Sequence, residues 1–294
     1  MTKEQLKNLP VEREFFIGID SDGCAFPSME LKHKECFIPN TIKHWKLQSI
    51  SKYAREAAEF VNLYSQWRGE NRFPALLRVF DLLRDRPEVR KSAARIPELP
   101  ALREWVSRAE ALGNPALRRE IEGNPEPDLI QTLKWSEAVN CTVAEMVVDL
   151  QSFPGVREAL EKMTPKADVI VVSATPGQAL QREWVQADLA GYVRLIAGQE
   201  LGSKQEHLAL AAAGRYREEK MLMIGDAPGD MKAAEAVGAR FYPIIPGSEE
   251  RCWEQLLEEA LDLFFAGEYT GDYERNRIEQ FNRLLPDTPP WKKL

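Results

Sequence analysis

Two aspartates near the N-terminus combine a spacing and a setting that suit catalysis. Asp20 and Asp22 are separated by one residue and lie at the end of an apolar segment, 15–20. Such a segment predicts a buried strand, and reactive groups in open α/β sheets lie just beyond the carboxyl ends of strands. Two carboxylates placed there can divide labour, because one can attack an electrophile while the other transfers protons.

Two other interpretations of this segment were considered. A plain strand-to-turn junction is one of them, because Asp22 and Gly23 form a common turn sequence. An EF-hand calcium loop also begins with Asp-x-Asp, but its fifth and twelfth positions would here be Cys24 and Leu31. The twelfth position of that loop needs a bidentate glutamate, so the calcium site is excluded.

Further polar residues stand at matching places in the second half of the chain. Ser173 and Asp226 each follow a short apolar segment, Lys204 stands where a helix is predicted to begin, and Asp230 comes four residues after Asp226. Each has an ordinary structural interpretation when taken singly. Ser173 would be a loop hydroxyl, Lys204 a solvated charge and Asp230 the N-cap of the following helix. Their joint occurrence with the first two aspartates favours a catalytic site.

Taken together, these segments resemble the motifs of the haloacid-dehalogenase-like hydrolases. That family has a D-x-D strand end, a strand-terminal Ser or Thr, a lysine at a helix start and a G-D-x-x-x-D loop. The chain contains all four in this order, as Asp20-Ser21-Asp22, Val172-Ser173, Ser203-Lys204 and Gly225-Asp226-Ala227-Pro228-Gly229-Asp230. The resemblance covers residues 12–30 and 150–248.

The resemblance implies a phosphohydrolase that cleaves a small phosphorylated metabolite. Asp20 is then the expected nucleophile, which forms an aspartyl-phosphate, and Asp22 the acid/base that serves the leaving group and the attacking water. Ser173 and Lys204 complete the expected catalytic set. Ser173, Ala174 and Lys204 are the residues expected to bind the substrate.

The resemblance also implies Mg²⁺ as the cofactor. Its expected ligand residues are Asp20, Asp22 through the backbone carbonyl, Asp226 and Asp230. Oxygen ligands of this kind are those that Mg²⁺ prefers. Asp230 is expected to contact Lys204 or a metal-bound water.

Within this resemblance, the aspartate at position 22 narrows the class of reaction that is expected. Dehalogenases of the superfamily lack an acid at that position, and its ATPases typically have threonine there, so aspartate favours phosphatases and phosphomutases. A phosphonatase would use a Schiff-base lysine from the cap, for which Lys43, Lys46 and Lys52 are available. A non-catalytic scaffold is disfavoured, because a scaffold has no need to keep two adjacent carboxylates.

The pattern of elements predicts an α/β fold with a Rossmann-like parallel sheet core flanked by helices and an all-helical cap domain. Strands alternate with helices after residue 153, which predicts a parallel sheet covered on both faces. The expected core comprises 1–30 and 150–266, the cap 31–149, and a C-terminal tail 267–294. The cap insertion follows the first motif, as in the helical-cap branch of the family that the motifs resemble.

Helical periodicity predicts the elements of the cap and their boundaries. One long amphipathic helix is expected from Ile50 to Tyr64, and a second begins near Pro74. Capping boxes are predicted at Thr175 and Ser203. The remaining cap helices are expected at 98–112, 115–122, 127–138 and 142–151. The chain after residue 247 is expected to be helical to about 265 and extended at its end.

Five cap side chains are candidates for substrate contact, each with packing or simple solvation as its alternative interpretation. They are Lys32, His44, Trp45, Arg68 and Arg72.

Composition narrows the class of protein. The 294 residues are 44% hydrophobic and 29% charged, which is ordinary for a globular protein, and the net charge of −7 argues against a nucleic-acid partner. The four cysteines show no paired spacing of a zinc site or disulfide framework. The polar N-terminus has no apolar signal segment, and no stretch is long enough to span a bilayer. A cytoplasmic location without a membrane partner is therefore expected.

Overall fold

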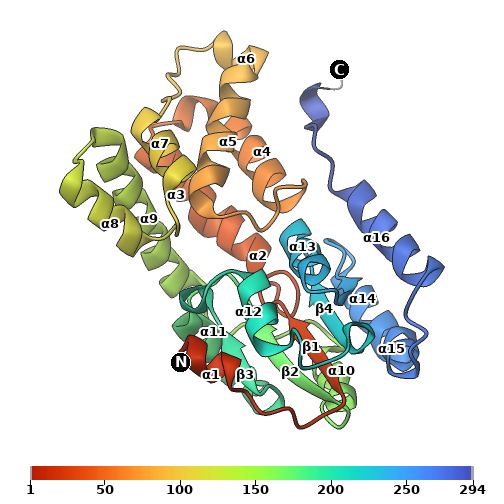
Figure 1. Cartoon of the computed structure of the whole chain (residues 1–294). Coiled ribbons are helices and arrows are strands. Elements are labelled where there is room, and N and C mark those ends of the chain that lie inside the picture. The colour runs from red at the N-terminus through yellow and green to blue at the C-terminus, as the bar shows by residue number, and fades with distance from the viewer. Residues whose placement is uncertain (1, 293–294) are drawn as a thin grey trace. The chain divides into compact units, whose positions relative to one another are not determined.

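The computed structural model describes residues 2–292, which form two compact units (Figure 1). The first unit comprises Met1–Met29 and Asp149–Pro286, and the second comprises Glu30–Val148 and Asp287–Leu294. The chain therefore passes between the units three times, after Met29, Val148 and Pro286. Residues 267–286 of the expected tail thus lie in the first unit, whereas the segment that follows lies in the second.

A five-stranded, all-parallel sheet forms the centre of the first unit, in the order β3-β2-β1-β4-β5. Ile19 of β1 is level with Val171 of β2 on one side and with Ile224 of β4 on the other. The residues that follow these three strands consequently meet at one edge of the sheet. The topology confirms the predicted α/β fold with a parallel sheet. The strands are β1 (Phe15–Ile19), β2 (Ala167–Val172), β3 (Leu195–Ala197), β4 (Met221–Gly225) and β5 (Arg240–Pro243).

Helices flank this sheet and approach it closely. Gly18 of β1 allows one such approach, because a Cβ atom there would lie 2.9 Å from Leu208 of α12. The helix α12 also packs on α13 and β2, and α13 packs on β4 and β5. The α-helices are α1 (Lys3–Lys7), α10 (Val156–Met163), α11 (Gly177–Gln186), α12 (Lys204–Ala211), α13 (Pro228–Ala236), α14 (Glu249–Gln255), α15 (Leu261–Ala266) and α16 (Asp272–Leu284).

The described residues of the second unit form helices joined by loops and contain no strand, as predicted for the inserted region. Its buried apolar side chains form one cluster that includes Phe80, Trp105 and Trp135. A π-helical segment, Lys32–Phe37, follows the short helix at the junction of the two units. The α-helices are α2 (Ser28–Leu31), α3 (Ile38–His44), α4 (Ser51–Leu63), α5 (Arg72–Asp85), α6 (Pro87–Arg90), α7 (Pro100–Arg108), α8 (Asn114–Gly123) and α9 (Pro127–Met146).

One prediction about helices is wrong, and one helix was not predicted. The two helices expected at 127–138 and 142–151 are one continuous helix, α9, because Trp135 and Val139 continue a single buried face. The helix α16 was missed because Phe281 is its only fully buried side chain. Its position depends on a distant contact instead, since Glu274 accepts a hydrogen bond from the backbone N–H of Phe241 at 3.0 Å.

No helix among residues 2–292 is both long enough and apolar enough to cross a membrane.

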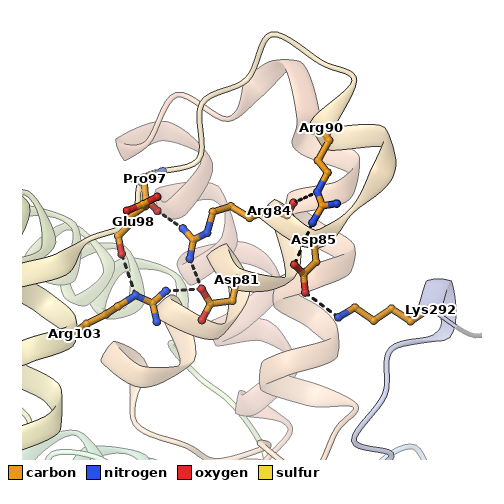
Figure 2. Close-up of polar contacts among 8 residues, drawn as sticks. All are labelled: Asp81, Arg84, Asp85, Arg90, Pro97, Glu98, Arg103 and Lys292. Carbon is orange, nitrogen blue, oxygen red and sulfur yellow. Dashed lines mark hydrogen bonds and ion pairs between the residues drawn. The ribbon is translucent and has the colours of Figure 1, made fainter.

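The last described residues pack against the helical unit. The ring of Trp291 contacts that of Phe60, with 5.7 Å between centroids. The Arg86 guanidinium lies between the rings of Tyr53 and Trp291, at 4.5 and 4.6 Å. Close by, Lys292 donates to Asp85 at 3.0 Å (Figure 2). The C-terminal segment is therefore part of the helical unit's packing.

Replacing Trp291 with alanine is expected to destabilise the helical unit by about 1–2 kcal/mol, because the substitution removes one aromatic contact and one cation–π contact. Thermal denaturation of the full chain measures this. The matched control is Lys292→Ala, which removes only an exposed ion pair worth less than about 1 kcal/mol. Equal melting temperatures for wild type and Trp291→Ala would show that the segment contributes nothing to the packing.

Candidate active site

Three buried carboxylates gather at the edge where the strands end. They belong to Asp20, Asp226 and Asp230, and each offers one oxygen that lies within 4.8 Å of the others. Asp20 directly follows β1 and Asp226 directly follows β4, so the sheet register brings the first two together. Asp230 comes from the first turn of α13.

Asp20 is held by hydrogen bonds to both of its carboxylate oxygens and by one from its backbone N–H. Its N–H donates to the Ile224 carbonyl at 2.9 Å, which continues the pairing of β1 with β4. Its Oδ1 accepts from the N–H of Ser21 at 2.7 Å, and its Oδ2 accepts from Lys204 Nζ at 2.7 Å. The carboxylate is only 4% exposed and has a fixed orientation.

Lys204 brings one positive charge to this cluster. It is the first residue of α12, where Ser203 and Glu206 form the predicted capping box. Its Nζ also donates to Asp230 Oδ1 at 2.6 Å, so the contact considered for this pair is present. Burial lowers the pKa of the Lys204 ammonium, but the surrounding carboxylates more than compensate and hold that pKa well above its usual value. Lys204 is therefore a permanent cation here.

Asp230 has a structural and an electrostatic role. Its Oδ2 accepts from the N–H of Ala227 at 3.0 Å, which caps the start of α13, while its Oδ1 faces Lys204. Burial raises the pKa of Asp230 to about 6, although the charge of Lys204 opposes the rise. Gly225 permits the arrangement, because a Cβ atom there would lie 2.4 Å from the Cβ of Asp230.

The charges of this cluster fit a divalent cation. Lys204 contacts two of the three buried carboxylates, and three ionised carboxylates carry more negative charge than this one ammonium group offsets. Such an excess is costly unless a counter-charge is supplied. Carboxylate oxygens on a partly dehydrated site are the ligands that Mg²⁺ takes in proteins. Asp20, Asp226 and Asp230 could therefore hold a metal ion.

Asp22 lies outside this group of three and has its own partners. Its Oδ2 accepts from the Thr175 hydroxyl at 2.6 Å, and its Oδ1 accepts from the Ser28 hydroxyl. The capping box predicted at Thr175 is absent, because α11 begins at Gly177 without a side-chain cap. The Thr175 hydroxyl is instead engaged by Asp22, which is the stronger acceptor because it is a carboxylate.

Ser173 and Ala174 occupy the loop after β2. Ser173 is 2% exposed, and its Oγ accepts from the N–H of Thr175 at 3.2 Å. Its own N–H donates to the Ala197 carbonyl at 3.0 Å, which fixes the loop against β3. Ala174 is exposed. The roles of Ser173 and Ala174 toward a substrate stay predictions.

Sequence reasoning missed Thr175 and Ser28 as site residues. A signal for Thr175 was present, because Ser173 and Thr175 follow β2 with the same spacing that Asp20 and Asp22 have after the neighbouring strand. Ser28 had none, since no pattern in the sequence indicates that the start of α2 lies beside Asp22.

We expect Thr175→Val to slow the hydrolysis of alkyl phosphates about 10-fold. Asp22 is the expected general acid, and the variant removes the hydroxyl that helps to orient it. A general acid raises the rate about 10²–10⁴-fold, and the variant should lose part of this factor. With p-nitrophenyl phosphate the rate of the first step, measured as pre-steady-state release of p-nitrophenol, should change little, since that leaving group needs no proton. Thr175→Ser, which keeps the hydroxyl, is the matched control. Equal losses of the first-step rate on both substrates would indicate a general structural defect rather than a role in positioning Asp22.

The cap residues proposed for substrate contact are mostly engaged within the helical unit. The Trp45 ring contacts those of Phe80 and Trp135, at 5.2 and 5.5 Å, which is core packing. Arg68 is 3% exposed and its Nη1 donates to the Leu63 carbonyl. Lys32 is buried as well, whereas His44 is partly exposed.

Comparison with known proteins gave matches among solved structures only. No family model and no curated protein matches the chain. A haloacid dehalogenase-like hydrolase from Streptococcus pneumoniae is 13% identical with a TM-score of 0.48, over 82% of this chain and 90% of that one. A predicted phosphatase from Clostridium acetobutylicum is 13% identical with a TM-score of 0.47, over 86% and 100%. A haloacid dehalogenase-like hydrolase from Xanthomonas campestris is 12% identical with a TM-score of 0.47, over 88% and 95%.

At such low identity these structures say nothing about the activity of this chain. We therefore base its function on its own residues.

Proposed function

We propose that this protein is a metal-dependent phosphohydrolase that cleaves a small phosphorylated metabolite through an aspartyl-phosphate on Asp20. The observation that carries the proposal is the contact of Lys204 with both Asp20 and Asp230, beside the buried Asp226. A phosphate monoester is a dianion and repels a carboxylate nucleophile. The Lys204 ammonium group next to Asp20 reduces this repulsion, and a divalent ion held by the neighbouring carboxylates would reduce it further.

The residues then have separate roles. Asp20 attacks phosphorus, and its two hydrogen bonds hold the carboxylate in a fixed orientation. Asp22 gives a proton to the departing alkoxide and later takes one from the water that hydrolyses the phospho-enzyme. Lys204 and the Ser173 hydroxyl are the proposed donors to the phosphoryl oxygens. A Mg²⁺ ion held by Asp20, Asp226, Asp230 and the Asp22 carbonyl would neutralise charge on the phosphoryl group.

Phosphate release from a panel of phosphate esters tests the proposal. The panel holds p-nitrophenyl phosphate with sugar, nucleotide and small-acid phosphates, each assayed with Mg²⁺ and with EDTA. We expect turnover with Mg²⁺ and none with EDTA, and the best ester defines the substrate class. As a second measurement, beryllofluoride with Mg²⁺ should raise the melting temperature, since it mimics a phosphoryl group on an aspartate. Silence in both measurements would contradict the hydrolase and favour a binding protein with the same fold.

A further inference from the structure

Arg72 has an unusual setting in the helical unit. It is the first residue of α5 and its guanidinium reaches α9, where Nη1 donates to Asn140 Oδ1 at 2.7 Å and to Ser136 Oγ at 3.0 Å. The same nitrogen lies 3.3 Å from the Ser136 carbonyl. The flat face of the guanidinium covers the Phe37 ring, with 5.0 Å to the centroid. Neutral groups therefore fix the guanidinium in place.

No carboxylate neutralises this charge among residues 2–292. Other arginines of the same unit form ion pairs, as Arg78 does with Glu70 and Arg86 with Glu56. Burial lowers the pKa of Arg72 to about 10, and no nearby charge opposes the change. A partly buried cation without an anion is energetically unfavourable, because buried charges are normally paired. The setting of Arg72 is thus that of a receptor for an anion.

The guanidinium also keeps donors available. All its hydrogen bonds to the described part of the chain use Nη1, so Nε and Nη2 are uncommitted. These two nitrogens form the edge of the guanidinium that binds both oxygens of a carboxylate.

A small cavity adjoins this arginine. Its volume is about 20 Å³, which is room for one or two water-sized groups. Its walls are largely apolar, with Leu76, Val79 and Trp135 among them, and Asn62 adds an amide. An apolar wall beside one cation suits an anion with a short hydrocarbon part better than a phosphate, which needs donors on several sides.

We propose that the helical unit binds a small carboxylate at Arg72. One edge of the guanidinium holds the two carboxylate oxygens, and the aliphatic part of the ligand occupies the apolar cavity. No residue of this site belongs to the carboxylate cluster that the proposed hydrolase uses, and acetate binding is measured without turnover, so either proposal can fail without the other.

Binding of ¹³C-labelled acetate to the full chain, followed by NMR line broadening, tests the site. Acetamide is the neutral control of the same shape, and sodium chloride at equal ionic strength controls for charge alone. We expect saturable binding of acetate to wild type, at least 10-fold weaker binding to Arg72→Gln, and unchanged binding to Arg78→Gln. Arg72→Lys keeps the positive charge but lacks the pair of donors formed by Nε and Nη2, so this variant should also bind acetate weakly. Circular dichroism and melting temperature establish that each variant is folded.

Three outcomes would overturn the site. They are the absence of saturable acetate binding to wild type, equal competition by acetamide or chloride, and wild-type affinity in folded Arg72→Gln.

A second experiment identifies the source of the carboxylate. Phosphate esters with and without a terminal carboxylate are compared as substrates of Arg72→Gln. A KM increase confined to the carboxylated esters assigns the carboxylate to the substrate, whereas unchanged KM values with lost acetate binding assign it to a separate ligand.

Discussion

Asn in place of Asp20 is expected to reduce kcat for phosphate release by at least ~10³-fold, since it removes the nucleophile of the proposed reaction. The amide has nearly the same shape as the carboxylate, and the contact with the Ser21 N–H can persist. The variant also removes one of three buried carboxylates that lie close together, which reduces their mutual repulsion. Its melting temperature without Mg²⁺ should therefore equal or exceed that of wild type.

Two measurements separate loss of the nucleophile from loss of the fold. Steady-state turnover is followed together with thermal unfolding in EDTA, and the matched control is Asp188→Asn, a carboxylate that is 94% exposed on its side chain. A rapid-quench experiment should show a burst of alcohol product from wild type and none from Asp20→Asn. Substantial turnover by Asp20→Asn would point to direct attack by water and would refute the aspartyl-phosphate mechanism.

Much of the carboxylate site could be predicted because its residues lie at the ends of short apolar strands. Parallel pairing of β1 with β4 brings Asp20 and Asp226 to one edge of the sheet. Once these two strands are expected to be parallel neighbours, the position of both aspartates follows from the strand ends. The position of Lys204 could also be predicted, because the capping box at Ser203 marks the start of the helix α12 in the sequence.

The remaining features depend on contacts between distant segments. Thr175 has the local signature of a helix cap, yet a carboxylate more than 150 residues away captures its hydroxyl. The helix α16 is mostly polar, and its contacts with the distant strand β5 include the hydrogen bond that Glu274 accepts from the Phe241 N–H. Local patterns do not report such partners. The setting of Arg72 belongs to the same class, because it depends on groups of α9.

A lysine that contacts two buried carboxylates should matter for stability as well as for rate. Lys204→Met keeps the apolar stem and removes the ammonium group. We expect kcat to fall by ~10²–10³, the typical loss for one electrostatic contact to the transition state. We also expect the free energy of unfolding in EDTA to fall by about 3–5 kcal/mol, because Asp20 and Asp230 lose their partner while they stay buried.

Mg²⁺ distinguishes this effect from a simple packing defect. In Lys204→Met the cluster of Asp20, Asp226 and Asp230 loses the ammonium group that contacts two of its carboxylates, so a bound divalent ion would supply positive charge that this variant lacks. Urea unfolding with Mg²⁺ and with EDTA should therefore show a larger stabilisation by Mg²⁺ for the variant than for wild type. Lys3→Met, which alters an exposed ion pair with Glu206, is the control and should behave as wild type does. If Mg²⁺ stabilises Lys204→Met no more than it stabilises wild type, the three carboxylates do not form the metal site.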